Sequence, residues 1–198
     1  MENYIFEVEN TVSGELCDEI IKKFESDHRK EQGRMSRGVD TTVKKSTDIR
    51  SGQYDDWFPI GQVAGVEVAK AMKQYLNHLN KTGLNINNIV DDVLENSRIG
   101  FPNIQKTEQG GYYKWHIDET TKNRLITYII YLNDVEEGCG GTTDFSCGKS
   151  VIPKRGKLLL FPATWNYIHT GKTLKKGVKY IATGFVFFND DKEIKNRG

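Results

Sequence analysis

The hydrophobic period of this chain changes near its midpoint, and this change constrains the fold more than any other feature. Up to about residue 90, apolar residues recur at the spacing of amphipathic helices. Beyond that point, short runs rich in Ile, Val, Thr, Tyr and Phe alternate with turns that contain glycine. Helices followed by many short strands predict a β-sandwich or jelly roll with helices packed on one face.

The first half predicts two helices with a polar segment between them. After a short strand at residues 4–8, Ser13 is placed to cap the first helix, because a serine there accepts a backbone N–H of the first turn. The second helix is expected to begin near Pro59, which suits a first helical turn, and to end at Gly83. The polar stretch 27–56 is either a mobile loop or a set of short edge strands.

The second half predicts seven strands within a single domain that spans residues 1–198. Residues 1–90 form mainly helical support and a polar loop, and residues 98–188 form the β core. The expected strands are 98–104, 112–117, 125–132, 142–145, 157–161, 167–170 and 178–188.

Charge and composition exclude several classes of protein. Lys and Arg number 28 and Asp and Glu 27, for a net charge of +1, so no nucleic-acid partner is expected. No run of about 18 apolar residues predicts a membrane span, and the N-terminus lacks a signal-peptide pattern. Cys17, Cys139 and Cys147 are expected to be free thiols in a reducing cytoplasm. The predicted location is cytoplasmic, with no membrane partner, and the sequence specifies no oligomeric state.

Three residues carry the pattern of a metal site. His116 and Asp118 are two apart on a predicted strand, so their side chains point to the same face. His169 lies far along the chain in another predicted strand. Two histidines and one carboxylate on one side of a metal form the facial triad of non-haem Fe(II) oxygenases, which leaves positions open for a chelating cosubstrate and O₂.

A lysine follows the second histidine. If the segment after His169 is a hairpin centred on Leu174, Lys179 lies opposite His169 on the same face. Its cation would then lie about one cosubstrate length from the metal. The alternative is a solvated charge, in a segment that already holds Lys172, Lys175 and Lys176. On the strand 125–132, the hydroxyls of Tyr131 and Thr127 share a face and are candidate partners of a carboxylate held by this lysine.

The order of these residues resembles the 2-oxoglutarate- and Fe(II)-dependent oxygenases of the prolyl 4-hydroxylase type, as a small microbial or phage-like member. The resemblance covers residues 98–188 closely and the N-terminal helix more loosely. Its motifs are Gly-Gly-Tyr-Tyr-Lys-Trp-His-Ile-Asp, Tyr-Leu-Asn, Gly-Gly-Thr-Thr-Asp-Phe, Lys-Leu-Leu-Leu-Phe-Pro and Gly-Val-Lys-Tyr. It implies an α+β fold, a double-stranded β-helix (jelly roll) of about eight strands with the N-terminal helices on one sheet.

The resemblance also implies the cofactors and the role of each site residue. His116, Asp118 and His169 bind Fe(II) as the catalytic and metal residues. Lys179 pairs with the distal carboxylate of 2-oxoglutarate, Tyr131 hydrogen-bonds it, and Thr127 is a further cosubstrate contact. O₂ is the oxidant, and ascorbate is the implied reductant.

The implied reaction is hydroxylation of a C–H bond with release of succinate and CO₂. The expected substrate is a peptidyl proline or another protein residue, so a protein or peptide partner is expected. Asp118 favours hydroxylation, because halogenating relatives lack this carboxylate. The alternatives are the same chemistry on a free amino acid or small molecule, a cupin-type metalloenzyme without 2-oxoglutarate, and a non-catalytic binding module.

Two features depart from the family pattern or extend it. Relatives often have a tyrosine nine or ten residues before the first histidine, where this chain has Lys106 and Thr107. The sequence does not say what replaces that tyrosine. Arg34 and Arg37, with Trp57 at the end of the polar stretch, are expected to form either a lid over the site or a solvated surface loop.

Overall fold

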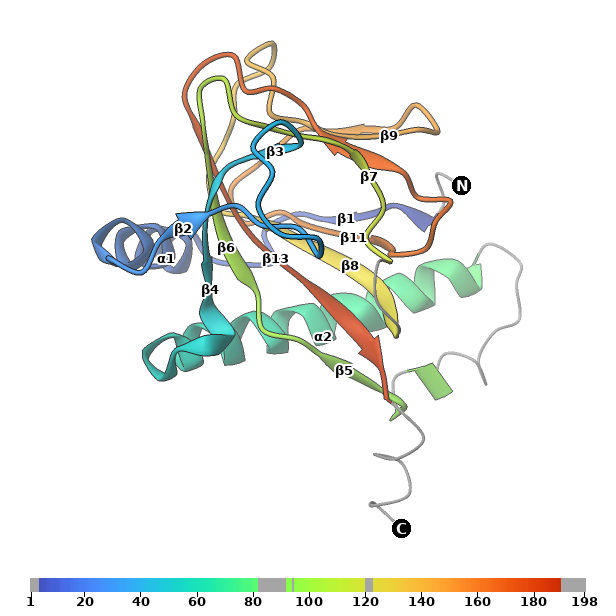
Figure 1. The fold of residues 1–198 in the computed structure, drawn as a ribbon. Helices are drawn as coiled ribbons and strands as arrows, with labels where there is room; N and C mark the ends of the chain where they lie inside the picture. The colour runs from blue at the N-terminus through green and yellow to red at the C-terminus, as the bar shows by residue number, and fades with distance from the viewer. Residues whose placement is uncertain (1–3, 82–91, 94, 120–122, 190–198) are drawn as a thin grey trace.

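Two antiparallel sheets face each other, and two helices cover the outer face of the larger one (Figure 1). The structure is a computed structural model that describes residues 4–81, 92–93, 95–119 and 123–189. The larger sheet runs in the order β1-β11-β8-β13-β6-β4-β2, and β5 also pairs with β13. Its strands are β1 (Phe6–Val8), β2 (Glu31–Gln32), β4 (Thr47–Arg50), β5 (Ser97–Ile99), β6 (Asn103–Glu108), β8 (Arg124–Tyr131), β11 (Leu158–Pro162) and β13 (Val178–Phe188).

The smaller sheet runs in the order β10-β9-β12-β7-β3. Its strands are β3 (Lys44–Lys45), β7 (Tyr112–His116), β9 (Thr143–Phe145), β10 (Ser150–Val151) and β12 (His169–Gly171). This arrangement confirms the predicted jelly roll with helices on one sheet, and the described residues form 13 strands in place of about eight.

The two predicted helices are present. In α1 (Gly14–Ser26), the Ser13 hydroxyl accepts a hydrogen bond from the backbone N–H of Leu16 at 3.2 Å, as a helix cap does. The second helix, α2 (Phe58–Lys81), has Pro59 in its first turn. Its predicted end at Gly83 lies outside the described residues. Both helices bury their apolar faces against the larger sheet.

Alternation along the central strands separates this helix-facing core from the space between the sheets. On β8, Ile126, Tyr128 and Ile130 pack in the helix-facing cluster. Ile129 and Tyr131 belong instead to a second cluster between the sheets. Successive side chains of a strand point to opposite faces, so the residues between the helix-facing ones are aimed at the smaller sheet. The shared face predicted for Thr127, Ile129 and Tyr131 is this inner face.

The polar stretch contributes short edge strands to both sheets. β2 and β4 extend the larger sheet, and β3 pairs with β7 in the smaller one. The edge-strand interpretation is therefore confirmed. The run predicted as one strand at 98–104 forms two, β5 and β6, separated by Gly100-Phe101-Pro102. The proline in this interruption has no N–H to donate to a ladder. The short strand β10 was not predicted.

The predicted hairpin between His169 and Lys179 is wrong. β12 pairs with β7 and β9, whereas β13 pairs with β5, β6 and β8, so the two residues belong to different sheets. Leu174, predicted as the centre of the hairpin turn, is fully buried. Its backbone is hydrogen-bonded to Gly110 and Gly111, which holds the segment as a crossover between sheets.

We call residues 33–46, which join β2 to β4 and include β3, the strap. The strap is anchored by a buried ion pair, in which Lys44 Nζ lies 2.6 Å from Asp48 Oδ2. The Ser46 hydroxyl donates to the other carboxylate oxygen at 2.7 Å. Trp57, expected with the strap arginines, is instead fully buried in the core and donates its indole N–H to Asp27 at 2.8 Å. Its assignment to a lid or a surface loop was wrong.

The anchoring pair gives a prediction about stability. Asp48→Asn should lower the free energy of unfolding by about 3–5 kcal/mol, because it leaves the buried Lys44 ammonium without its counter-charge. Chemical denaturation measures this value. Asp55→Asn, on an exposed carboxylate in the same region, is the matched control and should cost less than about 0.5 kcal/mol. Equal stabilities of the two variants would contradict a structural role for the pair.

Two sequence expectations concern the whole chain. All three cysteines are free thiols, as predicted. Among the described residues, no helix is both long enough and apolar enough to cross a bilayer.

Candidate active site

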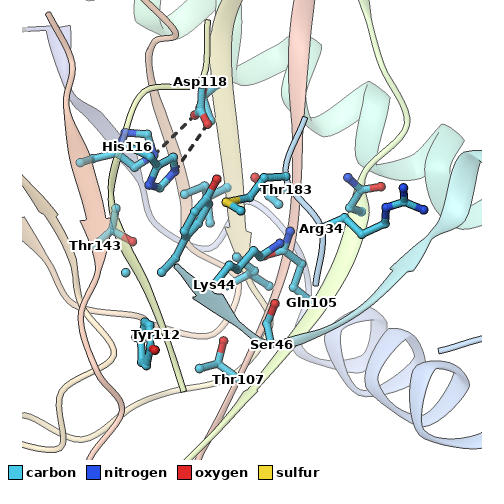
Figure 2. A pocket seen from close by; sticks show the side chains of 18 of the residues that line it. Arg34, Lys44, Ser46, Gln105, Thr107, Tyr112, His116, Asp118, Thr143 and Thr183 are labelled. Carbon is cyan, nitrogen blue, oxygen red and sulfur yellow. Dashed lines mark hydrogen bonds and ion pairs between the residues drawn. The ribbon is translucent and has the colours of Figure 1, made fainter. Parts of the chain in front are cut away.

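A cavity of about 680 Å³ opens between the two sheets and is closed on one side by the strap. Its walls come from β6, β8 and β13 of the larger sheet and from β7, β9 and β12 of the smaller one. His116, Asp118 and His169 all line it, and so does Lys179. Residues from three segments far apart in the sequence therefore reach one cavity, and Figure 2 shows His116 and Asp118 on one side of it.

The pairing of β7 with β12 brings the two histidines together. His116 and His169 are direct neighbours in the ladder, and their ring centroids lie 4.1 Å apart. Asp118 follows β7 and turns its carboxylate toward both rings, as the dashed lines in Figure 2 show. Its Oδ1 lies 3.6 Å from His116 Nε2, and its Oδ2 lies 3.5 Å from His169 Nε2.

Backbone carbonyls orient both imidazoles. The Nδ1–H of His116 donates to the carbonyl of Lys114 at 2.8 Å, and that of His169 donates to the carbonyl of Tyr167 at 3.0 Å. Because a carbonyl only accepts, each proton is held on Nδ1 and each Nε2 lone pair faces the carboxylate. Burial, with the neighbouring His169, lowers the pKa of His116 to about 3. Its ring is therefore neutral at physiological pH, which is the form that binds a metal.

The three donors fit a single cation. Metal–nitrogen and metal–oxygen bonds of roughly 2.0–2.2 Å place two ligand atoms of one ion at most about 4.4 Å apart. The separations of 3.5 and 3.6 Å satisfy this limit and exceed normal hydrogen-bond length. Two neutral imidazoles and one carboxylate are also the donor set of the Fe(II) facial triad. Among the described residues, this is the single cluster of three such donors.

Two side chains from β8 hold Asp118 in place. The Thr127 hydroxyl donates to Asp118 Oδ2 at 2.7 Å, and Arg124 donates to the backbone carbonyl of Asp118 at 2.6 Å. The Arg124 guanidinium also lies 3.8 Å from the ring centroid of Phe185. Thr127 thus contacts the metal-facing carboxylate. Its expected contact with a cosubstrate stays a prediction.

Lys179 is buried on the inner face of β13. Its ammonium donates to the carbonyl of Gly141 at 2.7 Å and lies 5.5 Å from the ring centroid of Tyr131. Gly140 and Gly141 both have positive φ, which turns the chain so that this carbonyl meets the lysine. Burial lowers the pKa of Lys179 to about 8, and the more distant Asp144 opposes that shift. The alternative of a solvated charge is excluded, because the residue is only 6% exposed.

Tyr131 lies behind the cavity wall. It is fully buried, and its hydroxyl donates to the Thr143 hydroxyl at 2.8 Å. Thr143 lines the cavity and appears in Figure 2 on the same side as His116. A hydroxyl pair therefore connects the buried tyrosine to the site. The expected contact of Tyr131 with the cosubstrate stays a prediction, and Thr143 is the residue that lies between the tyrosine and the cavity.

The two residues at the position of the relatives' tyrosine face opposite ways. Lys106 points toward α1, where its ammonium lies 3.0 Å from Glu25. Thr107 lines the cavity and is the ladder partner of Lys179. The short Thr107 side chain therefore lines the cavity at a position where relatives often have a tyrosine.

The strap supplies cavity residues that the sequence identified only in part. Arg34 and Arg37 line the cavity, as the lid interpretation required of them, and Lys44 and Ser46 line it too. Lys44, Ser46 and the wall residues Gln105, Thr143 and Arg124 were not singled out from the sequence. On their strands, Gln105 and Thr143 alternate with residues that point away from the cavity. The period of two therefore identifies both as cavity residues once the face of each strand that looks toward His116 is known.

Comparison with known proteins agrees with this geometry. The family model of the 2OG-Fe(II) oxygenase superfamily matches residues 102–187. A PKHD-type hydroxylase of Idiomarina loihiensis is 23% identical over 188 residues, which cover 92% of this chain and 77% of that protein.

Solved prolyl hydroxylases have a similar fold. A prolyl hydroxylase from Trichoplax adhaerens, solved with a hypoxia-inducible-factor peptide, has a TM-score of 0.68, 18% identity and coverage of 99% of this chain and 88% of that chain. The viral collagen prolyl hydroxylase of Paramecium bursaria Chlorella virus-1, solved with 2-oxoglutarate, has a TM-score of 0.62, 21% identity and coverage of 94% and 97%. A prolyl-4-hydroxylase of Pseudomonas putida has a TM-score of 0.62 and 15% identity, with coverage of 94% of this chain and 93% of that chain.

The family match spans the strands that carry the three metal-facing donors and the buried lysine. The fold, the donor set and the family match agree on Fe(II), 2-oxoglutarate and O₂ as the cofactor and cosubstrates. The resemblance read from the sequence is confirmed: residues 102–187 match the 2OG-Fe(II) oxygenase superfamily, and the family match, the donor set and the prolyl 4-hydroxylase-like fold indicate a 2-oxoglutarate-dependent dioxygenase.

Proposed function

We propose that the chain hydroxylates a C–H bond of a protein or peptide residue, with peptidyl proline as the first candidate. The reaction consumes 2-oxoglutarate and O₂; one oxygen atom enters the product and the other enters succinate, with release of CO₂. The observation that carries the proposal is the convergence of His116, Asp118, His169 and Lys179 on one cavity.

In this proposal, His116, Asp118 and His169 hold the metal. When bound, Fe(II) supplies the coordination sites and the redox chemistry for oxidation of the substrate by O₂. The protein orients the donors: the two backbone carbonyls fix the imidazole tautomers, and Thr127 fixes one carboxylate oxygen.

Lys179 binds the distal carboxylate of 2-oxoglutarate. A buried ammonium beside an apolar wall forms a strong charge-assisted hydrogen bond, because little water competes for it. Ile129 and Ile181 line the cavity and exclude water from the path between this lysine and the metal donors. Thr143 supplies a hydroxyl at the cavity, and the Tyr131 hydroxyl bonds to it from behind the wall.

A protein substrate is favoured over a free amino acid. The prolyl hydroxylase from Trichoplax adhaerens was solved with a peptide fragment, which supports a peptide as the substrate of a similar fold. The cavity also exceeds what a five-carbon diacid alone requires, so it has room for a substrate side chain. A cytoplasmic location and ascorbate as the reductant are parts of the same proposal.

The test is a search for oxygen gained by a substrate. A cell extract and a peptide library are incubated with the protein, Fe(II), 2-oxoglutarate and ¹⁸O₂, and products are identified by mass spectrometry. We expect peptides that gain one labelled oxygen, with succinate formed in equal amount. Asp118→Ala is the control and should give neither product. Oxygen gained without succinate, or succinate formation in the control, would contradict the proposed reaction.

The lowered pKa of Lys179 predicts how cosubstrate affinity depends on pH. The ammonium form binds the carboxylate, and in the free protein it is lost as the pH rises through about 8. Because a bound carboxylate stabilises the ammonium, affinity for 2-oxoglutarate should be constant below about pH 7 and fall up to about tenfold per unit above 8. Anaerobic calorimetry across this range measures it. In Lys179→Met, the affinity for 2-oxoglutarate should not change with pH across this range. If the variant and the unmodified protein show the same pH dependence, Lys179 is not the group that binds the carboxylate.

A further inference from the structure

The charge of the cavity differs sharply from the charge of the chain. The whole chain is nearly neutral, with a net charge of +1. Among the described residues that line the cavity, however, seven are Lys or Arg and only Asp118 is acidic. A concave surface of one sign attracts ligands of the opposite sign. The excess of cations therefore needs an explanation in terms of what the cavity binds.

Apart from Lys179, which donates to the carbonyl of Gly141, four of the seven cations have partners within the protein. Lys44 pairs with Asp48, Arg50 pairs with Glu31 at 2.6 Å, and Lys172 lies 3.6 Å from Asp144. The fourth, Arg124, donates to the backbone of Asp118 and stacks over Phe185. These contacts are structural and leave three cations to account for.

The proposed cosubstrate accounts for one of the three. Fe(II) with two positive charges, the Asp118 carboxylate, doubly negative 2-oxoglutarate and the Lys179 ammonium sum to zero. The loaded centre is thus neutral without any help from the strap. Arg34 and Arg37 remain, and neither forms an ion pair within the part of the chain that the structure describes.

The strap holds these two arginines at the cavity. Met35, which follows Arg34, and Gly38, which follows Arg37, exchange backbone hydrogen bonds of 2.9 and 3.0 Å, which close a tight turn. Gly38 has φ of 112°, a conformation that favours glycine. The side chains of Arg34 and Arg37 are exposed, so their guanidinium groups are accessible to a ligand that enters from solvent.

Figure 2 shows where Arg34 lies relative to the metal-facing residues. It is on the opposite side of the pocket from His116 and Asp118, and its side chain extends away from the two. An anion bound there belongs to a part of the substrate other than the carbon that is oxidised. This separation suits an acidic side chain near the target residue in a peptide better than the carboxylate of a compact amino acid.

We propose that the substrate is an acidic peptide segment, in which a carboxylate side chain close to the target residue pairs with Arg34 and Arg37. This inference rests on the proposed function and names its substrate class. The ion pairs between the peptide carboxylate and the two arginines are exposed, so each adds modestly to the binding affinity. Together they make an acidic peptide bind about 3- to 30-fold more tightly than a neutral one at low salt.

The experiment compares binding of matched peptides. Short peptides with a central proline or alanine carry either Glu or the isosteric Gln on both sides, with both termini blocked. Their binding to the protein loaded anaerobically with Fe(II) and 2-oxoglutarate is measured by fluorescence anisotropy. We expect the Glu peptides to bind about 3- to 30-fold more tightly, and added salt to remove the difference. The double variant R34Q/R37Q should bind both peptides equally, and K175Q/K176Q, on exposed lysines away from the cavity, should retain the preference.

Several results would overturn the inference. They are equal binding of the Glu and Gln peptides, a preference that survives in R34Q/R37Q, and no detectable binding of the Glu peptides. Displacement of the Glu peptide by free L-proline as effectively as by the unlabelled peptide would assign the arginines to a free amino acid instead. Because no O₂ is present, binding is independent of turnover. A protein that prefers the Glu peptides but forms no succinate in air would contradict the proposed function alone.

Discussion

Asp118→Ala is expected to abolish substrate hydroxylation while the protein stays folded. The carboxylate is the only anionic donor in the cluster of three, and it lies 3.5 to 3.6 Å from both Nε2 atoms. Loss of a residue that only orients a metal ligand typically lowers metal affinity or activity by about 10- to 100-fold. Loss of the metal ligand itself should therefore lower the rate by more than about 100-fold. His116→Ala should abolish turnover in the same way. Some 2-oxoglutarate binding should persist in the Asp118 variant, because Lys179 remains.

The measurement is succinate formation at saturating Fe(II) and 2-oxoglutarate, together with an anaerobic titration of both. Glu119→Ala is the matched control, because it removes an exposed carboxylate from the residue that directly follows Asp118. Its rate should be close to that of the unmodified protein. If Asp118→Ala keeps a near-normal rate, the carboxylate is not a required ligand, and the assignment of the site is wrong.

Lys179→Met should lower the affinity for 2-oxoglutarate by roughly 10- to 150-fold. The substitution keeps the aliphatic bulk of a fully buried side chain and removes its charge. A hydrogen bond to a charged group contributes about 1.5–3 kcal/mol, and about 1.4 kcal/mol corresponds to a factor of ten. Affinity for Fe(II) should change little, because the ammonium bonds to Gly141 and not to the metal-facing donors.

Lys175→Met and Lys176→Met are the controls, since both lysines are exposed in the crossover that precedes β13. The dependence of succinate formation on 2-oxoglutarate concentration separates the three variants. Equal dependence in all three would remove Lys179 from the cosubstrate site and with it the strongest chemical link to the proposed reaction.

The sequence predicted the local part of the site well. A His and an Asp two apart on a strand must share a face, and Ser13 must cap the helix that follows it, because both relations depend on a few neighbouring residues. The alternation that turns Thr127 and Tyr131 to the inner face is local in the same sense. These predictions needed no knowledge of how distant segments pair.

The pairing of distant strands was the part that failed. The hairpin hypothesis placed Lys179 against His169, because sequential strands often pair. In a jelly roll the chain instead crosses from one sheet to the other, and His169 pairs with His116, 53 residues earlier. Lys179 still lines the cavity, but it reaches it from the larger sheet, whereas His169 belongs to the smaller one. Leu174 is buried, but three polar or glycine residues flank it on each side, so no period was present from which the crossover could be identified.

The strap was equally hard to predict. β2, β3 and β4 are two to four residues long, and their polar residues show no alternation. Lys44 and Asp48 were not singled out from the sequence, yet together they form the buried anchor of the segment. Trp57 shows the reverse error: an aromatic residue beside a polar stretch was taken for part of a lid, and it belongs to the core.

The most direct test of the account is anaerobic binding of Fe(II) and 2-oxoglutarate to the intact chain, by equilibrium dialysis and calorimetry. The account predicts one Fe(II) per chain, lost in His116→Ala and Asp118→Ala. It also predicts that 2-oxoglutarate binds the iron-loaded protein much more tightly than the iron-free protein, and that Lys179→Met weakens this binding without changing the iron stoichiometry. Full iron binding by both ligand variants, or 2-oxoglutarate affinity that is the same with and without iron, would contradict it.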